Sequence, residues 1–202
     1  MARGLPSLAH PVMNPRPVSR CRVLVLALIA GCQGKSEPDP PRPPRLVIEA
    51  RTSGATVARI VAGHPCRADI DGNELLIGTQ PLVAQVGASR WSGDDAENGT
   101  TLRKNGDAIV RLRDTQDAGI EVFDPRGAVV LHVSGDGAIA NAHGEVLRRA
   151  EVMRAAVRIG DSVVTGTSDV ALGVLVTAPE LIPEVRGLAA CHRLFVREQA
   201  GK

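Results

Sequence analysis

Two cysteine–histidine pairs carry the most distinctive chemistry of this chain. His64-Pro65-Cys66 lies early in the sequence and Cys191-His192 lies near its end. Two thiols and two imidazoles are zinc donors, but their spacing is not that of a zinc finger. Neighbouring helical residues also point about 100° apart, which separates Cys191 from His192. The three interpretations are a disulfide between Cys66 and Cys191, two buried free thiols, and a metal site. An oxidising compartment outside the cytoplasm would favour the disulfide.

An acidic stretch beside the only tryptophan is the second candidate site. Residues 91–99 read Trp-Ser-Gly-Asp-Asp-Ala-Glu-Asn-Gly. This composition predicts a surface loop, and carboxylates on such a loop can bind a cation or a partner. The alternative is a solvated loop whose tryptophan packs against a sheet. The residues of this candidate binding loop are Trp91, Asp94, Asp95 and Glu97.

Motifs for catalysis are scarce. The sequence contains no Gly-x-Ser-x-Gly, Ser-x-x-Lys or His-Glu-x-x-His pattern. His64, His132 and His143 remain as acid–base candidates, and Asp124 and Asp136 lie near the last two in the sequence. Because no nucleophile accompanies them, we predict a protein that is not an enzyme and that needs no cofactor or metal. An envelope hydrolase or metal-dependent enzyme with an unrecognised His/Asp site is the alternative.

The first 33 residues resemble the export signal of bacterial lipoproteins. Four arginines and no acidic residue precede the apolar run Val23–Ala30, which is too short to span a bilayer. Ile29-Ala30-Gly31-Cys32 then resembles the lipobox of that family. The resemblance implies that the Cys32 thiol receives a diacylglyceryl group and that cleavage occurs before Cys32. Acylation of the new amino terminus would make the anchoring stable, because one chain alone binds membranes only marginally.

This resemblance divides the chain into a signal peptide over residues 1–31, a lipidated cysteine with a proline-rich linker over 32–44, and one domain over 45–202. Gln33 stands where an aspartate would favour the inner membrane, so we expect the periplasmic face of the outer membrane. The implied partners are membrane lipid, through acylated Cys32, and an envelope protein. Export also favours the Cys66–Cys191 disulfide.

Charge and composition narrow the function further. Four of the 24 lysines and arginines lie before residue 32, which leaves 20 against 22 acidic residues and a net charge near −2. This balance argues against a nucleic-acid partner. The chain has three aromatic residues and no tyrosine, so a sugar platform is also disfavoured. We therefore predict a non-enzymatic interaction or assembly module, with an ion- or small-ligand-binding lipoprotein as a further alternative.

Turn signals predict a mainly β domain. Asp or Asn followed three residues later by Gly, the pattern of a type I turn, recurs at 69–72, 124–127 and 141–144. Asn105-Gly106 and Gly160-Asp161 add two hairpin signals. Together they predict an antiparallel, meander or sandwich-like sheet. Residues 144–158 contain good helix formers, but the β-branched valines favour a strand there.

The end of the domain has a different pattern. Ser168 or Asp169 can cap a short helix through Leu175, which Ala178-Pro179 ends. Pro183 suits the first turn of another helix, along which Val185, Leu188, Ala189, His192 and Phe195 recur at helical spacing. The sequence therefore predicts a helical tail over about 168–198, formed by two short helices packed on the sheet.

Overall fold

Fourteen strands follow one another between residues 45 and 200, the part of the chain that this computed structural model describes. They are β1 (Val47–Thr52), β2 (Ala55–Val61), β3 (Cys66–Ile70), β4 (Asn73–Thr79), β5 (Leu82–Val86), β6 (Ser89–Ala96), β7 (Gly99–Lys104), β8 (Asp107–Asp114), β9 (Ile120–Phe123), β10 (Val129–Val133), β11 (Ala138–Ala140), β12 (Val146–Met153), β13 (Ala156–Ile159) and β14 (Ser162–Thr165). Each strand pairs antiparallel with the next. The predictions for the leader, for Cys32 and for the linker lie outside the described residues.

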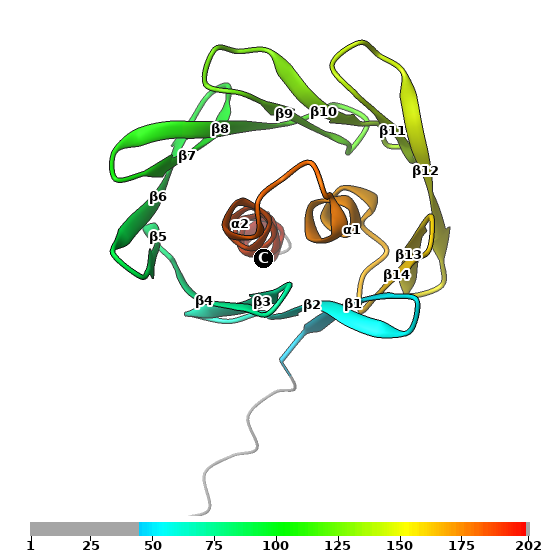
Figure 1. Ribbon diagram of the computed structural model, residues 1–202, viewed down its shortest axis with the longest axis horizontal. Helices are drawn as coiled ribbons and strands as arrows, with labels where there is room; N and C mark the ends of the chain where they lie inside the picture. Colours follow the sequence, from blue (N-terminus) through cyan, green and yellow to red (C-terminus); the bar gives the residue numbers. More distant parts are fainter. Residues whose placement is uncertain (1–44, 201–202) are drawn as a thin grey trace, which may run out of the picture. The chain divides into compact units, whose positions relative to one another are not determined.

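The sheet closes on itself to form a barrel (Figure 1). β1 pairs antiparallel with β14, for example Glu49 with Thr165, so the first and last strands are neighbours. The predicted meander is confirmed, whereas the sandwich-like arrangement is replaced by this closed barrel. Residues 144–158 contribute β12 and β13, which pair as a hairpin with Val152 opposite Val157. The preference for strand over helix in this region is therefore confirmed.

Hairpin turns alternate between the two ends of the barrel. The β1–β2, β3–β4 and β7–β8 turns lie at one end, which we call the rear mouth, and the β6–β7, β8–β9 and β10–β11 turns lie at the other, the front mouth. The β9–β10 turn has the predicted pattern, because the Gly127 amide donates to the Asp124 carbonyl. The pattern predicted for 69–72 is wrong. Asp69 belongs to β3, and Asp71 and Gly72 alone form the turn, with φ of 51° and 78°, as a type I′ turn requires.

Two helices occupy the interior of the barrel (Figure 1). α1 spans Val170–Thr177, and α2 spans Pro183–Ala200, beginning at the predicted proline. The two predicted C-terminal helices are confirmed, and both pack against strands, on the inner face of the barrel wall that surrounds them. α1 is short, with 8 residues, but α2 has 18 residues and is longer than predicted. None of the helices within 45–200 combines the length and the apolar character that crossing a membrane requires.

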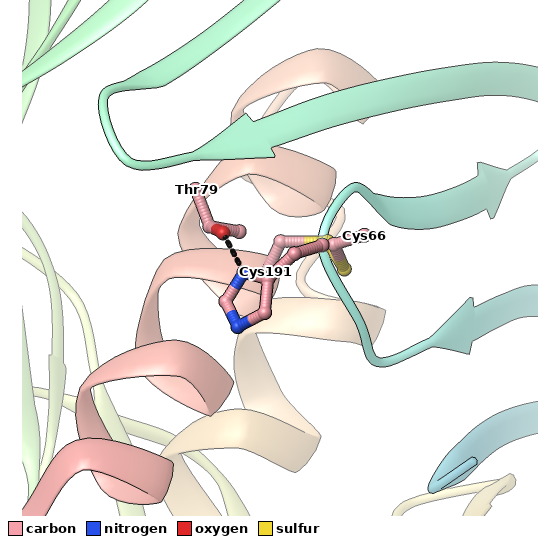
Figure 2. Close-up of a disulfide and its surroundings, with 4 residues drawn as sticks. Cys66, Thr79 and Cys191 are labelled. Atoms are coloured by element: carbon pink, nitrogen blue, oxygen red, sulfur yellow. Dashed lines mark hydrogen bonds between the residues drawn. A yellow bond between two sulfur atoms is a disulfide. The ribbon is translucent and has the colours of Figure 1, made fainter. Parts of the chain in front are cut away.

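A close helix–wall contact accounts for one glycine of α2. A Cβ on Gly187 would lie 2.5 Å from the Leu75 side chain and 3.3 Å from Cβ of Ala68, so glycine lets α2 approach β3 and β4. The Cys66–Cys191 disulfide then fixes the same helix to the first residue of β3 (Figure 2). Its two Cα atoms are 6.0 Å apart, across a sequence separation of 125 residues. The predicted disulfide is confirmed.

Candidate ligand groove

One sector of the barrel interior is left open at the front mouth. α2 packs against β2–β5, and α1 packs against β1, β2, β10, β12 and β13. A groove of about 370 Å³ lies between the second half of α2 and strands β7–β9. Its apolar lining includes Leu112, Ala118, Ile120, Ala189 and Val196, and its polar lining includes Thr100, Asp114, Thr115, Gln116, His192, Arg193 and Arg197.

A buried ion-pair cluster borders this groove. Arg193 is 8% exposed, and its Nε donates to Oδ2 of Asp169 at 2.6 Å. Nη1 of Arg193 also donates to Asp114, and Nη1 of Arg197 lies 3.0 Å from the same Asp169 oxygen. Burial lowers the pKa of Arg193, but Asp169 and Asp114 outweigh it and raise that pKa above its ordinary value. Arg193 is therefore a permanently charged, fixed part of the groove wall.

Asp169 serves this cluster rather than capping α1. Its backbone occupies the N-cap position, but its carboxylate makes no capping hydrogen bond to the helix. The side chain is 2% exposed and accepts from Arg193 through both oxygens. The predicted start of the helix at this position is therefore confirmed, because α1 begins at the next residue. The prediction that the Asp169 side chain caps the helix is wrong. A buried carboxylate needs paired cations, and α2 supplies two of them.

His192 forms a polar contact set with β6 and β7 at the edge of the groove. Its Nε2 lies 2.9 Å from Oγ1 of Thr100 and 3.3 Å from Oδ1 of Asp95, and the Thr100 hydroxyl lies 2.7 Å from the same oxygen. Burial lowers the pKa of His192, and the charges of Asp95 and Asp114 only partly oppose this. A catalytic triad requires nucleophile and acid on different ring nitrogens, whereas here both contacts are at Nε2. The arrangement is therefore that of a fixed neutral imidazole and not that of a catalytic triad.

The acidic stretch is a hairpin and not the predicted loop. Trp91 belongs to β6, is fully buried and lies under the Lys104 ammonium at 5.6 Å from the ring centroid. Asp94 pairs with Arg103 at 2.7 Å, while Asp95 contacts the groove residues Thr100 and His192. Glu97 is exposed in the β6–β7 turn. Of the four candidates, Asp95 is thus the one joined to the groove by hydrogen bonding.

The cysteine–histidine set does not assemble as a zinc site, because both thiols are used by the disulfide. Nδ1 of His64 and the Thr79 hydroxyl share a hydrogen bond, and Figure 2 shows Thr79 near the disulfide. His132 pairs with Glu121 at 3.4 Å on β9–β10, and His143 is exposed in the β11–β12 turn. These histidines therefore do not converge on the groove. Across residues 45–200, no group of three or more His, Cys, Asp or Glu side chains is arranged to hold a metal ion.

The groove cluster was not found by the sequence reasoning. Arg193 and Arg197 are four residues apart, so one face of α2 carries both, and Asp169 precedes α1. That spacing was the available signal, but the partner carboxylates lie 79 and 24 residues from Arg193 in the sequence. No protein-family model, no curated protein and no solved structure matches this chain. Geometry and the residues themselves therefore carry the functional argument.

Proposed function

We propose that this protein is a non-enzymatic, lipid-anchored protein of the cell envelope whose barrel domain binds a small ligand in the front-mouth groove. The anchor rests on the lipobox-like Ile29–Cys32 and on the implied acylation of Cys32. The periplasmic face of the outer membrane remains the expected location, because Gln33 follows the cysteine.

The groove is the observation that carries the ligand-binding proposal. Its volume of about 370 Å³ lies in the range of small-molecule sites, which combine apolar walls with a few fixed polar groups. Arg193 and His192 are such groups, since burial and hydrogen bonds hold both in place. In the described part of the chain, pairing of β1 with β14 leaves no strand edge at the ends of the sheet for strand addition by a partner.

A protein-interaction or assembly module is the second candidate. Three apolar side chains of β12 are well exposed: Val146 at 50%, Leu147 at 44% and Val152 at 58%. Exposed apolar side chains that gather on one element are typical of contact surfaces. The two candidates place the functional contact on different parts of the barrel, so substitutions can separate them.

Mass spectrometry of the membrane-extracted protein tests the proposal. Under denaturing conditions, we expect a chain that begins at Cys32 and carries acyl mass. Under native conditions, we expect an additional non-covalent small-molecule mass. Val196→Phe fills the groove at a side chain that is 41% exposed, and should remove this mass.

Val146→Phe is the matched control, because it enlarges an exposed valine on β12 and should leave the small-molecule mass in place. Loss of a co-purifying protein in Val146→Phe, with no small-molecule mass in the wild type, would favour the second candidate. An unprocessed or unlipidated chain would contradict the anchor, and a wild-type protein without any bound mass would contradict the ligand.

A further inference from the structure

The groove combines an apolar floor with carboxylates at its rim. Leu112 and Ile120 come from the barrel wall, and Ala189 and Val196 come from α2. Asp114 lies at the end of β8 in the groove lining, and Asp95 is bonded to the lining residues Thr100 and His192. A ligand in the groove therefore meets both apolar surface and carboxylates.

The charges around the groove do not cancel. Among the described residues that line it, the cations are Arg193 and Arg197, and they are balanced by Asp169 and Asp114. Asp95 remains as an additional negative charge, because the lowered pKa of His192 leaves its imidazole neutral at neutral pH. The flanking turns add Glu97 and Asp117, and hydrogen bonds from the Gly135 amide and the Thr115 hydroxyl lower the pKa of Asp117 to about 2.

The two rim carboxylates also keep hydrogen-bonding capacity. Asp95 is 69% exposed and Asp114 is 65% exposed, although one oxygen of each is held by a protein donor. Thr100 fixes Oδ1 of Asp95, and Arg193 fixes Oδ1 of Asp114. In each case Oδ2 has no hydrogen bond from a residue within 45–200 and is available to a ligand. Carboxylates that are already oriented lose less entropy when they bind.

We infer that the groove selects a small amphiphilic cation, namely a protonated amine attached to a short apolar chain. This inference rests on the proposed ligand-binding function and adds the chemical class of the ligand. The ammonium group would lie at Asp95 and Asp114, where its donors meet oriented acceptors. The apolar chain would lie along Leu112, Ile120 and Val196, where it is removed from water.

Three probes with the same chain and different head groups test this inference: n-hexylamine, n-hexanol and n-hexanoate. The protein for this experiment would be residues 33–202, secreted behind a cleavable leader. It keeps all the described contacts, which lie within 45–200. Because it lacks Cys32, no acyl group or detergent competes for the probes. Binding would be followed by the NMR shifts of the Leu112, Ile120 and Val196 methyl groups. We expect the amine to bind about three- to tenfold more tightly than the alcohol, the factor that one or two exposed ion pairs supply.

Asp95→Asn and Asp94→Asn are the matched variants, since these neighbours differ in whether they contact the groove. Asp95→Asn should reduce the preference for amine over alcohol about threefold, and Asp94→Asn should leave it unchanged. Raising the salt concentration should weaken amine binding and leave alcohol binding unaffected. Equal binding of all three probes, or tighter binding of hexanoate, would overturn the inference but keep a ligand groove. Binding of none of them at these methyl groups would overturn both.

Discussion

The two mouths of the barrel each hold a buried arginine of α2, but they satisfy it in different ways. At the rear mouth, Arg186 is 5% exposed and donates from Nε to the Val176 carbonyl at 3.0 Å, and its remaining partner is the half-exposed Asp71. At the front mouth, Arg193 is 8% exposed and binds the fully buried carboxylate of Asp169 as well as Asp114. The rear arginine thus completes the end of α1, whereas the front arginine neutralises a buried charge.

This difference separates a mouth whose buried arginine serves the backbone from one whose buried arginine serves a carboxylate. A backbone carbonyl at a helix end needs any good donor, and at the rear mouth Arg186 donates to the Val176 carbonyl. A carboxylate that is 2% exposed is costly without cations, and two arginines from one helix face meet that need beside an open groove. The rear mouth also has a cavity, of about 470 Å³, which Asp71 and Arg186 line, but among the described residues the fully buried carboxylate lies at the front mouth.

Replacing each of these two arginines in turn should have the largest effect on the stability of the protein. Arg193→Met leaves Asp169 buried with only Arg197 as partner, and we expect it to lower the free energy of unfolding by about 3–5 kcal/mol. Arg186→Met leaves the Val176 carbonyl without its donor and should cost about 1–3 kcal/mol. Urea unfolding followed by the fluorescence of buried Trp91 measures both.

The double variant Arg193→Met with Asp169→Asn sharpens this comparison. Because it removes the buried charge together with its partner, it should be more stable than Arg193→Met alone. Equal losses for Arg193→Met and Arg186→Met, with no recovery in the double variant, would mean that the two mouths are energetically alike.

Removing the disulfide should have the next largest effect on stability. The bridge joins α2 to the barrel wall on the front-mouth side of Gly187. Cys66→Ala with Cys191→Ala opens a covalent loop whose ends are 125 residues apart in the sequence. This double variant should lower the free energy of unfolding by about 2–5 kcal/mol. Amide hydrogen exchange should accelerate more around Arg193 than around Arg186, because the bridge lies at Cys191. Reduction of the wild-type bridge should reproduce both changes. Uniform acceleration along α2 would show that the helix responds as one unit.

The elements that the sequence predicted are those that short-range rules determine. The hairpin at Asn105-Gly106 and the start of α2 at Pro183 each depend on a few neighbouring residues, and Cys66 and Cys191 are the two cysteines between residues 45 and 202. Barrel closure does not, because alternating strands look the same in a sandwich and in a barrel. The difference lies in the pairing of β1 with β14, more than 100 residues apart.

The composition of α1 indicates that this helix lies inside the domain. Val170–Val176 is apolar around the whole helix and buried throughout, and a helix without a polar face belongs inside a core. The sequence of α2 does not indicate burial in the same way. Arg186 and Arg193 are buried, but in the sequence they resemble residues that face solvent until their partners are known. The groove follows from that same placement, so neither the cluster nor the cavity could be derived before the helices were placed inside the barrel.

The smallest expected effect concerns His192 and the pH dependence of the front mouth. Burial lowers the pKa of His192 in the folded protein, so below its ordinary value near 6.5 the unfolded chain binds a proton that the folded chain resists. Stability should therefore be fully present above pH 7 and fall as the pH decreases from 7 to 5. Urea midpoints measured at intervals of half a pH unit give the slope, and His192→Gln should flatten it.

His143→Gln is the control for that slope, because His143 is exposed in the β11–β12 turn at the rear mouth. It should keep the wild-type loss of stability between pH 7 and 5. If His143→Gln flattened the slope and His192→Gln did not, the acid sensitivity would belong to the rear mouth. If His192→Gln alone flattens it, the neutral imidazole beside Asp95 is part of the folded front mouth, and the carboxylate that faces it keeps its net charge for a ligand.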